Sequence, residues 1–139
     1  MKKIITKILL ASLIVIPALA DEKKLLVVLT SEDSLTQFMS LVLANEAQSK
    51  DANVSMLLCG KAGDLAIKGG KEVLMKPNDK SPQMLLDKLI KGGGNVEVCP
   101  PYLPNNQKTK EDLTDGIKVA SPSLVADSIL DKDTKILSY

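Results

Sequence analysis

Apolar segments of strand length alternate with segments of helical spacing along residues 24–139 of this chain. Residues 24–30 form a nearly continuous apolar run, which is typical of a strand buried on both faces of a parallel sheet. Four further segments have strand character: 53–59, 96–99, 117–120 and 135–139. Strands that alternate with helices indicate βαβ units with right-handed crossovers. The pattern therefore predicts an α/β fold, with a mainly parallel five-stranded sheet and helices on both faces.

Three segments predict amphipathic helices, and each has an apolar stripe that we expect to be buried. The stripe of the first helix, which ends near Lys50, has five members: Leu35, Phe38, Met39, Val42 and Leu43. The second begins at Ser81-Pro82 and ends at three glycines, 92–94, and its stripe has four members: Leu85, Leu86, Leu89 and Ile90. The third begins at Ser121-Pro122, with another four: Val125, Ala126, Ile129 and Leu130. Serine before proline favours both helix starts, because serine caps and proline suits the first helical position.

The first twenty residues have the pattern of a secretory signal peptide. Three lysines precede an apolar run at 8–16, and Ala18-Leu19-Ala20 has the small-x-small form of a cleavage site. A bilayer needs about 20 apolar residues, and this run is shorter, so we favour a cleaved signal over a membrane anchor. After cleavage we expect no stable membrane insertion. We expect residues 1–20 to be removed and residues 21–139 to form a single domain. The predicted location is periplasmic or secreted.

Composition excludes several kinds of function. Without the three signal lysines, 15 lysines stand against 17 acidic residues, a net charge of −2 that does not favour nucleic acid as a partner. The chain has no histidine and only two cysteines, so it lacks a Cys-His couple and the ligands of a four-cysteine zinc site. We therefore expect no metal and no cofactor.

Cys99 is the first candidate for chemistry. It follows a short predicted strand, so it lies at the carboxyl edge of the sheet, where open α/β folds place ligands. If Pro100 and Pro101 open a helical turn, Cys99 is its N-cap, and the backbone N–H groups there favour thiolate. The alternative is a small buried side chain with no chemical role.

The other candidates each have two interpretations. Cys59 also ends a predicted strand, so it either forms a disulfide with Cys99 or fills the core. Three acids lie at strand exits, where we favour helix capping over a functional role: Glu32, Asp33 and Asp64. Glu97 either faces outward on an edge strand or is a partly buried acid near Cys99.

Two segments carry a resemblance to a known family: residues 94–99, Gly-Asn-Val-Glu-Val-Cys, and residues 113–120, Leu-Thr-Asp-Gly-Ile-Lys-Val-Ala. With the order of strands and helices over residues 24–139, they resemble the DsrE-like family, the sulfur-relay fold shared by DsrE and TusD proteins. The resemblance implies a three-layer α/β/α sandwich, a homo-oligomer and a persulfide carried by Cys99. It also implies a sulfur donor or acceptor protein as partner, and a pocket rimmed by residues 100–110.

Two functions follow as hypotheses. One is sulfur binding or relay through Cys99, by a thiolate that accepts sulfane sulfur and passes it to a second thiol. The other is a non-catalytic module that binds a small ligand or a protein in the same crevice, where Cys99 only packs. Whether the protein is an enzyme stays open.

Overall fold

A computed structural model describes residues 22–139, so the predicted signal peptide at 1–20 lies outside the described residues. Five strands form one sheet in the order β4-β3-β2-β1-β5, and every neighbouring pair is parallel. The strands are β1 (Lys24–Leu29), β2 (Asn53–Leu58), β3 (Asn95–Val98), β4 (Ile117–Val119) and β5 (Thr134–Ser138). The predicted α/β class and parallel five-stranded sheet are confirmed.

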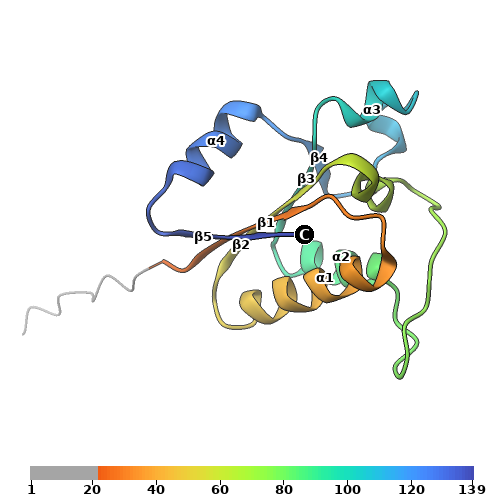
Figure 1. The fold of residues 1–139 in the computed structure, drawn as a ribbon, viewed down its shortest axis with the longest axis horizontal. Coiled ribbons are helices and arrows are strands. Elements are labelled where there is room, and N and C mark those ends of the chain that lie inside the picture. Colours follow the sequence, from red (N-terminus) through yellow and green to blue (C-terminus); the bar gives the residue numbers. More distant parts are fainter. Residues whose placement is uncertain (1–21) are drawn as a thin grey trace, which may run out of the picture.

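Helices lie on both faces of this sheet and make three layers (Figure 1). Helices α1 (Ser34–Gln48) and α2 (Pro82–Lys91) pack together on one face, and α4 (Pro122–Leu130) lies alone on the other. Shorter turns complete the chain: the 3₁₀ helix η1 (Gly60–Ala66), α3 (Tyr102–Asn105) and the 3₁₀ helix η2 (Lys110–Asp112). Within residues 22–139 no helix has the length and apolar character needed to cross a bilayer.

Local sequence explains where the helices begin. The Asp33 carboxylate accepts hydrogen bonds from the Thr36 N–H and hydroxyl, at 2.8 and 2.7 Å, and so caps α1. Ser81 caps α2 by accepting from the Met84 N–H at 3.2 Å, with Pro82 at the first helical position. The capping role favoured for Asp33 is therefore confirmed, as is the predicted start of α2.

The face of the sheet covered by α1 and α2 carries the hydrophobic core, and we call it the closed face. Alternate strand residues point into it, because side chains along a strand alternate between the two faces. The strand members of this core are Val27, Leu29, Val54, Met56, Leu58, Val96, Val98 and Ile117. On α2 the predicted stripe is buried at Leu85, Leu86 and Leu89 and partly buried at Ile90. Its prediction is confirmed.

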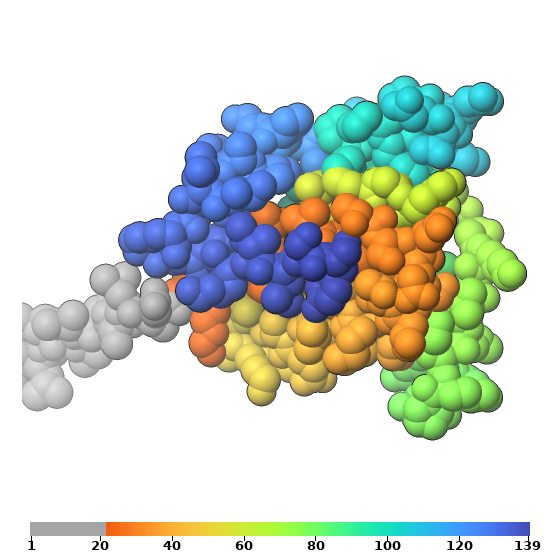
Figure 2. Space-filling view, in the orientation of Figure 1, coloured from red at the N-terminus to blue at the C-terminus, as the bar shows by residue number. Residues whose placement is uncertain are grey.

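The predicted buried face of α1 is wrong at three of its five positions: Leu35, Met39 and Leu43 are exposed, whereas Phe38 and Val42 are partly buried against the core. The residues that α1 buries are largely polar: Gln37, Ser40, Leu41, Ala44 and Asn45. Leu35 is 64% exposed and Met39 is 47% exposed. Figure 2 shows the α1 segment, in orange, at the surface of the molecule beside the dark blue β5.

Hydrogen bonds to α2 account for this rotation of α1. The Asn45 side-chain amide donates to the Leu41 carbonyl at 2.8 Å and to the Leu85 carbonyl at 3.0 Å. The Gln48 amide donates to the Leu89 carbonyl at 3.2 Å. A buried amide that loses its partners destabilises the fold, so these polar contacts keep this side of α1 against α2.

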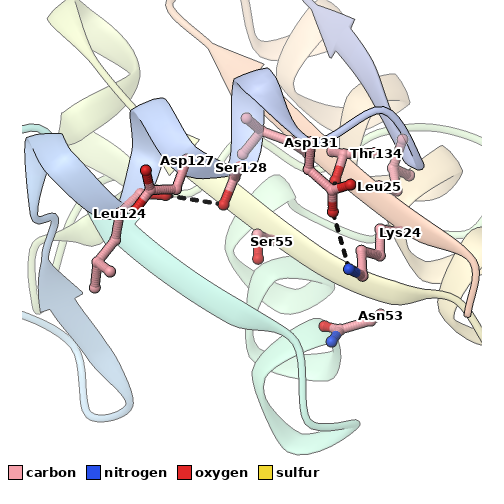
Figure 3. A pocket seen from close by; sticks show the side chains of 10 residues that line it. Lys24, Leu25, Asn53, Ser55, Leu124, Asp127, Ser128, Asp131 and Thr134 are labelled. Carbon is pink, nitrogen blue, oxygen red and sulfur yellow. Dashed lines mark hydrogen bonds and ion pairs between the residues drawn. The ribbon is translucent and has the colours of Figure 1, made fainter.

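The face below α4 is the open face. None of the nine residues of α4 is fully buried, so the burial predicted for Val125, Ala126, Ile129 and Leu130 is wrong, although Val125 is half-buried against the sheet. An ion pair between Lys24 and Asp131, 2.9 Å apart, ties the end of α4 to β1. Figure 3 shows this pair at the edge of a cavity of about 340 Å³ between α4 and the sheet. A single short helix cannot cover the same width of sheet as the α1–α2 pair.

Glu97 belongs to the open face. It pairs in register with Leu57 of β2 and Lys118 of β4, so β3 is an internal strand. The interpretation of Glu97 as an outward residue on an edge strand is therefore wrong, because β4 covers that edge. Its side chain is half-buried and lines a small cavity under α4.

Candidate functional site

The two cysteines lie side by side at the carboxyl edge of the sheet. Strands β2 and β3 are parallel neighbours, with Leu58 opposite Val98, so the next residue on each strand is a cysteine. The Cys59 and Cys99 Cα atoms are 5.1 Å apart, and the two side chains form a disulfide. Of the two interpretations of Cys59, the disulfide holds, and Cys59 is not a core filler.

The expected N-cap position of Cys99 is wrong. Helix α3 begins at Tyr102, and Pro101 occupies the N-cap position. The Tyr102 N–H donates to the Cys99 carbonyl at 3.0 Å, so residues 99–102 form a turn that precedes the helix. Two consecutive prolines carry the chain away from the strand before a helical turn can form. The helix is a single turn, as expected.

A pocket of about 400 Å³ opens beside the disulfide, and we call it the cysteine pocket. Its lining comes from two segments that follow β2 and β3: Cys59, Gly60, Lys61, Cys99, Pro101, Tyr102, Asn105 and Asn106. The rim predicted at residues 100–110 thus contributes half of the lining. The side-chain N–H groups of Asn105 and Asn106 donate to the Pro101 and Tyr102 carbonyls, both at 2.7 Å, which holds the rim in shape.

Tyr102 joins the cysteine pocket to η1. Its hydroxyl donates to the Asp64 carboxylate at 2.5 Å. Burial raises the pKa of the Tyr102 phenol, and the hydrogen bond to Asp64 raises it further, so the phenol stays protonated at neutral pH. A side chain at Gly63 would collide with the Tyr102 ring, so this glycine permits the contact. Asp64 therefore acts as an acceptor for Tyr102, and the capping role favoured for it is wrong.

Lys61 supplies the positive charge of the cysteine pocket. Within residues 22–139 its ammonium group makes no ion pair, whereas Lys24 in the cavity under α4 is paired with Asp131. A free cation near cysteines favours the thiolate form once the disulfide is reduced. The site thus combines a disulfide, a positive charge and an apolar wall, an arrangement that thiol–disulfide chemistry can use once the bond is reduced.

The sequence reasoning located Cys99, but it missed Lys61 and Tyr102. Lys61 could have been found from its place two residues after a strand-end cysteine. Tyr102 gave only a weak signal, as one of two tyrosines in the chain. Residues 22–139 contain no cluster of three or more acidic, cysteine or histidine side chains that could hold a metal ion.

Comparison with known proteins establishes the fold. No family model matches the chain, and no curated protein matches it in sequence. The ychN protein from E. coli is similar in structure, with a TM-score of 0.68 at 20% identity, over 85% of this chain and 99% of that one. The protein of unknown function MTH1491 from Methanobacterium thermoautotrophicum has a TM-score of 0.64 at 11% identity, over 85% of this chain and 100% of its own.

A third solved structure agrees with these two. BT1422 from Bacteroides thetaiotaomicron, a conserved protein of unknown function, has a TM-score of 0.63 at 21% identity, over 84% of this chain and 95% of its own. The chain therefore has the DsrE-like fold expected from the sequence. At these identities the likeness defines the fold alone.

Proposed function

We propose that this protein binds sulfane sulfur as a persulfide on Cys99 and passes it on, with Cys59 as the second thiol. The observation that carries the proposal is the bonded pair Cys59–Cys99 at the mouth of a pocket on the carboxyl edge of the sheet. Two cysteines that reach each other in this way can exchange sulfur without a metal or a histidine.

The loading step balances within this pair. When the cysteines are reduced, the Cys99 thiolate attacks the outer sulfur of a donor persulfide, the S–S bond of the donor breaks, and the donor leaves as its thiolate. An acceptor thiolate then attacks the outer sulfur of the Cys99 persulfide and takes it over, and Cys99 leaves as its thiolate. When no acceptor is bound, the Cys59 thiolate attacks the inner Cys99 sulfur and expels hydrosulfide, which forms the disulfide. A thiol reductant restores the two thiols and is itself oxidised to a disulfide. Lys61 stabilises the thiolates that form at each step.

Two further parts of the proposal concern where and with what the protein works. The proposed location is the periplasm or the outside of the cell, and the disulfide supports it because such bonds persist in oxidising compartments. A sulfur donor or acceptor protein is the proposed partner, since the open rim around Pro101 leaves the pocket accessible.

Intact mass measurement tests the proposal. The reduced protein and two variants, Cys59→Ser and Cys99→Ser, are each incubated with inorganic polysulfide. We expect Cys59→Ser to gain one sulfur atom and keep it, because no second thiol can expel it. The unmodified protein should gain the atom only briefly, release hydrosulfide and return to the disulfide. Cys99→Ser should gain none.

A purely structural disulfide is the competing explanation. For a separation of 40 residues the loop-closure model predicts about 4 kcal/mol of stabilisation. If the Cys59→Ser variant has an alkylatable Cys99 thiol and still gains no sulfur, the relay proposal is wrong and the disulfide is structural.

The second candidate function is a small-ligand binding module. The size of the cysteine pocket favours it, because about 400 Å³ lies within the range of ligand sites. Chemical-shift changes at Tyr102 and Asn105 with apolar ligands, on the disulfide form and without any sulfur gain, would favour this function over the relay.

A further inference from the structure

A second pocket, of about 270 Å³, lies next to the cysteine pocket, and we call it the polar pocket. It is built at the same carboxyl edge, from the residues after β1, from η1 and from the loop that leads to α2. Its polar lining includes six side chains: Glu32, Gln37, Lys61, Asp64, Lys71 and Gln83.

Two residues connect the pockets. Lys61 lines both of them. Asp64 lines the polar pocket, and its carboxylate accepts the hydroxyl proton of Tyr102, which lines the cysteine pocket. A molecule that reaches from one pocket to the other therefore passes Lys61 and the Tyr102–Asp64 hydrogen bond.

The polar pocket offers both signs of charge in unpaired form. Among the described residues, Lys61, Lys71 and Glu32 form no ion pair within 4.0 Å, so their charges are available to a ligand. The side-chain oxygen of Gln83 is buried and accepts no hydrogen bond within residues 22–139. The pocket can thus serve one anionic and one cationic group of a ligand.

We infer that the sulfur donor is the persulfide of an amino-acid-type thiol, with its carboxylate and ammonium groups held in the polar pocket. The inference rests on the proposed function. The carboxylate pairs with Lys71, the ammonium group pairs with Glu32, and the sulfur end lies in the cysteine pocket beside Lys61. Inorganic polysulfide carries only negative charge and has no cationic group for Glu32, and an uncharged thiol has no partner for either Glu32 or Lys71.

In the transfer from this donor, one S–S bond forms and one S–S bond breaks. The Cys99 thiolate attacks the outer sulfur of the R–S–SH group, a new S–S bond forms at Cys99, and the S–S bond of the donor breaks. The donor leaves as R–S⁻, its charge next to Lys61, and it takes up a proton from water. The transfer needs no oxidant and no reductant beyond the thiol that first opened the disulfide.

The first experiment measures the rate of one-sulfur gain by the reduced protein against the concentration of cysteine persulfide or of inorganic polysulfide. We expect Lys71→Gln to raise the half-saturating concentration of cysteine persulfide about tenfold, as for a lost charge-assisted hydrogen bond. The effect with polysulfide should be much smaller. Lys80→Gln removes an exposed lysine of the same loop that lines neither pocket and should change neither donor.

A second measurement separates this inference from the proposed function. S-methylcysteine carries the amino acid groups but cannot transfer sulfur, so its binding to the disulfide form, followed by calorimetry, tests the polar pocket alone. We expect binding that Lys71→Gln weakens about tenfold. If no binding is detected, the inference is overturned, even if Cys99 gains sulfur from polysulfide. Binding without any sulfur gain would instead overturn the relay and keep the pocket.

Discussion

The two faces of the sheet are built from the same five strands but are covered very differently. On the closed face, α1 and α2 bury a continuous core, and Leu89 of α2 is fully buried. On the open face, α4 buries none of its residues, and its last residue, Leu130, is 82% exposed. The closed face therefore provides most of the hydrophobic stabilisation, which scales with the apolar area removed from water.

The candidate site lies at the carboxyl edge of the sheet, where the strands end and the two faces meet. The disulfide and the cysteine pocket follow directly from β2 and β3, which the closed face holds in place. A rigid support of this kind keeps two sulfur atoms within bonding distance. The open face is covered by the single helix α4, and cavities lie under that helix beside the buried Leu26 and Leu57 (Figure 3).

The largest expected effect is on the free energy of unfolding, when a leucine is replaced by alanine on each face in turn. Leu89→Ala removes a fully buried side chain and should lower the free energy of unfolding by about 2–5 kcal/mol. Leu130→Ala removes an exposed side chain and should change it by about 0.5 kcal/mol at most. Urea unfolding of the disulfide form measures both. Equal losses would show that α4 is covered by something outside the single chain.

The second prediction, of intermediate size, concerns the association of this protein with a second copy of itself. The homo-oligomer expected from the resemblance stays a prediction, and the uncovered side of α4 is where we expect a second copy to pack. Sedimentation should show an oligomer for the unmodified protein and a monomer for the double variant Ile129→Glu, Leu130→Glu. Its unfolding free energy should change little, because neither residue is buried in the single chain.

The matched control for the association experiment places the same two negative charges at exposed positions of α1. Leu35→Glu with Met39→Glu also places two acids at exposed leucine and methionine positions, on the helix that covers the closed face. This variant should sediment like the unmodified protein. If it becomes the monomer and the α4 variant does not, the second copy packs on α1, and the prediction for the open face fails.

The smallest expected effect concerns the ion pair that ties α4 to β1. The hydrogen bond from Lys24 lowers the pKa of Asp131 to about 2, below the value of about 3.9 in an unfolded chain. A lowered folded-state pKa stabilises the fold above about pH 4, and this contribution is lost as the pH falls from about 4 to 2. Thermal unfolding of Asp131→Asn should show a shallower loss of stability across that range. Asp127→Asn, on the same helix but without an ion pair in residues 22–139, should follow the unmodified protein.

Helix rotation shows where reasoning from sequence fails. The spacing of Leu35, Met39 and Leu43 satisfies the rule for a buried stripe, yet all three are exposed. The rule considers one helix and water, whereas α1 also meets α2, whose Leu85 carbonyl accepts the Asn45 amide. Nothing near Asn45 in sequence indicates that partner, which lies 40 residues away.

In the candidate site, too, some features follow from local sequence and others depend on tertiary contacts. The predicted reactive position at Cys99 follows from a strand pattern and two prolines, and the structure places Cys99 at the expected edge. The disulfide, Lys61 and Tyr102 depend on which strands are neighbours and on how two loops meet. The proposed N-cap failed because Pro101 takes that position in place of Cys99.

Local pattern in the chain was enough to define the five strands, the helix starts at Asp33 and Ser81, and the α/β class. These features depend on side-chain alternation and on hydrogen bonds between residues a few positions apart, so short segments encode them. The strand order, the pairing of Cys59 with Cys99 and the unequal cover of the two faces were decided by tertiary structure. Each of these depends on contacts between residues tens of positions apart, whose partners are selected only when the whole core packs.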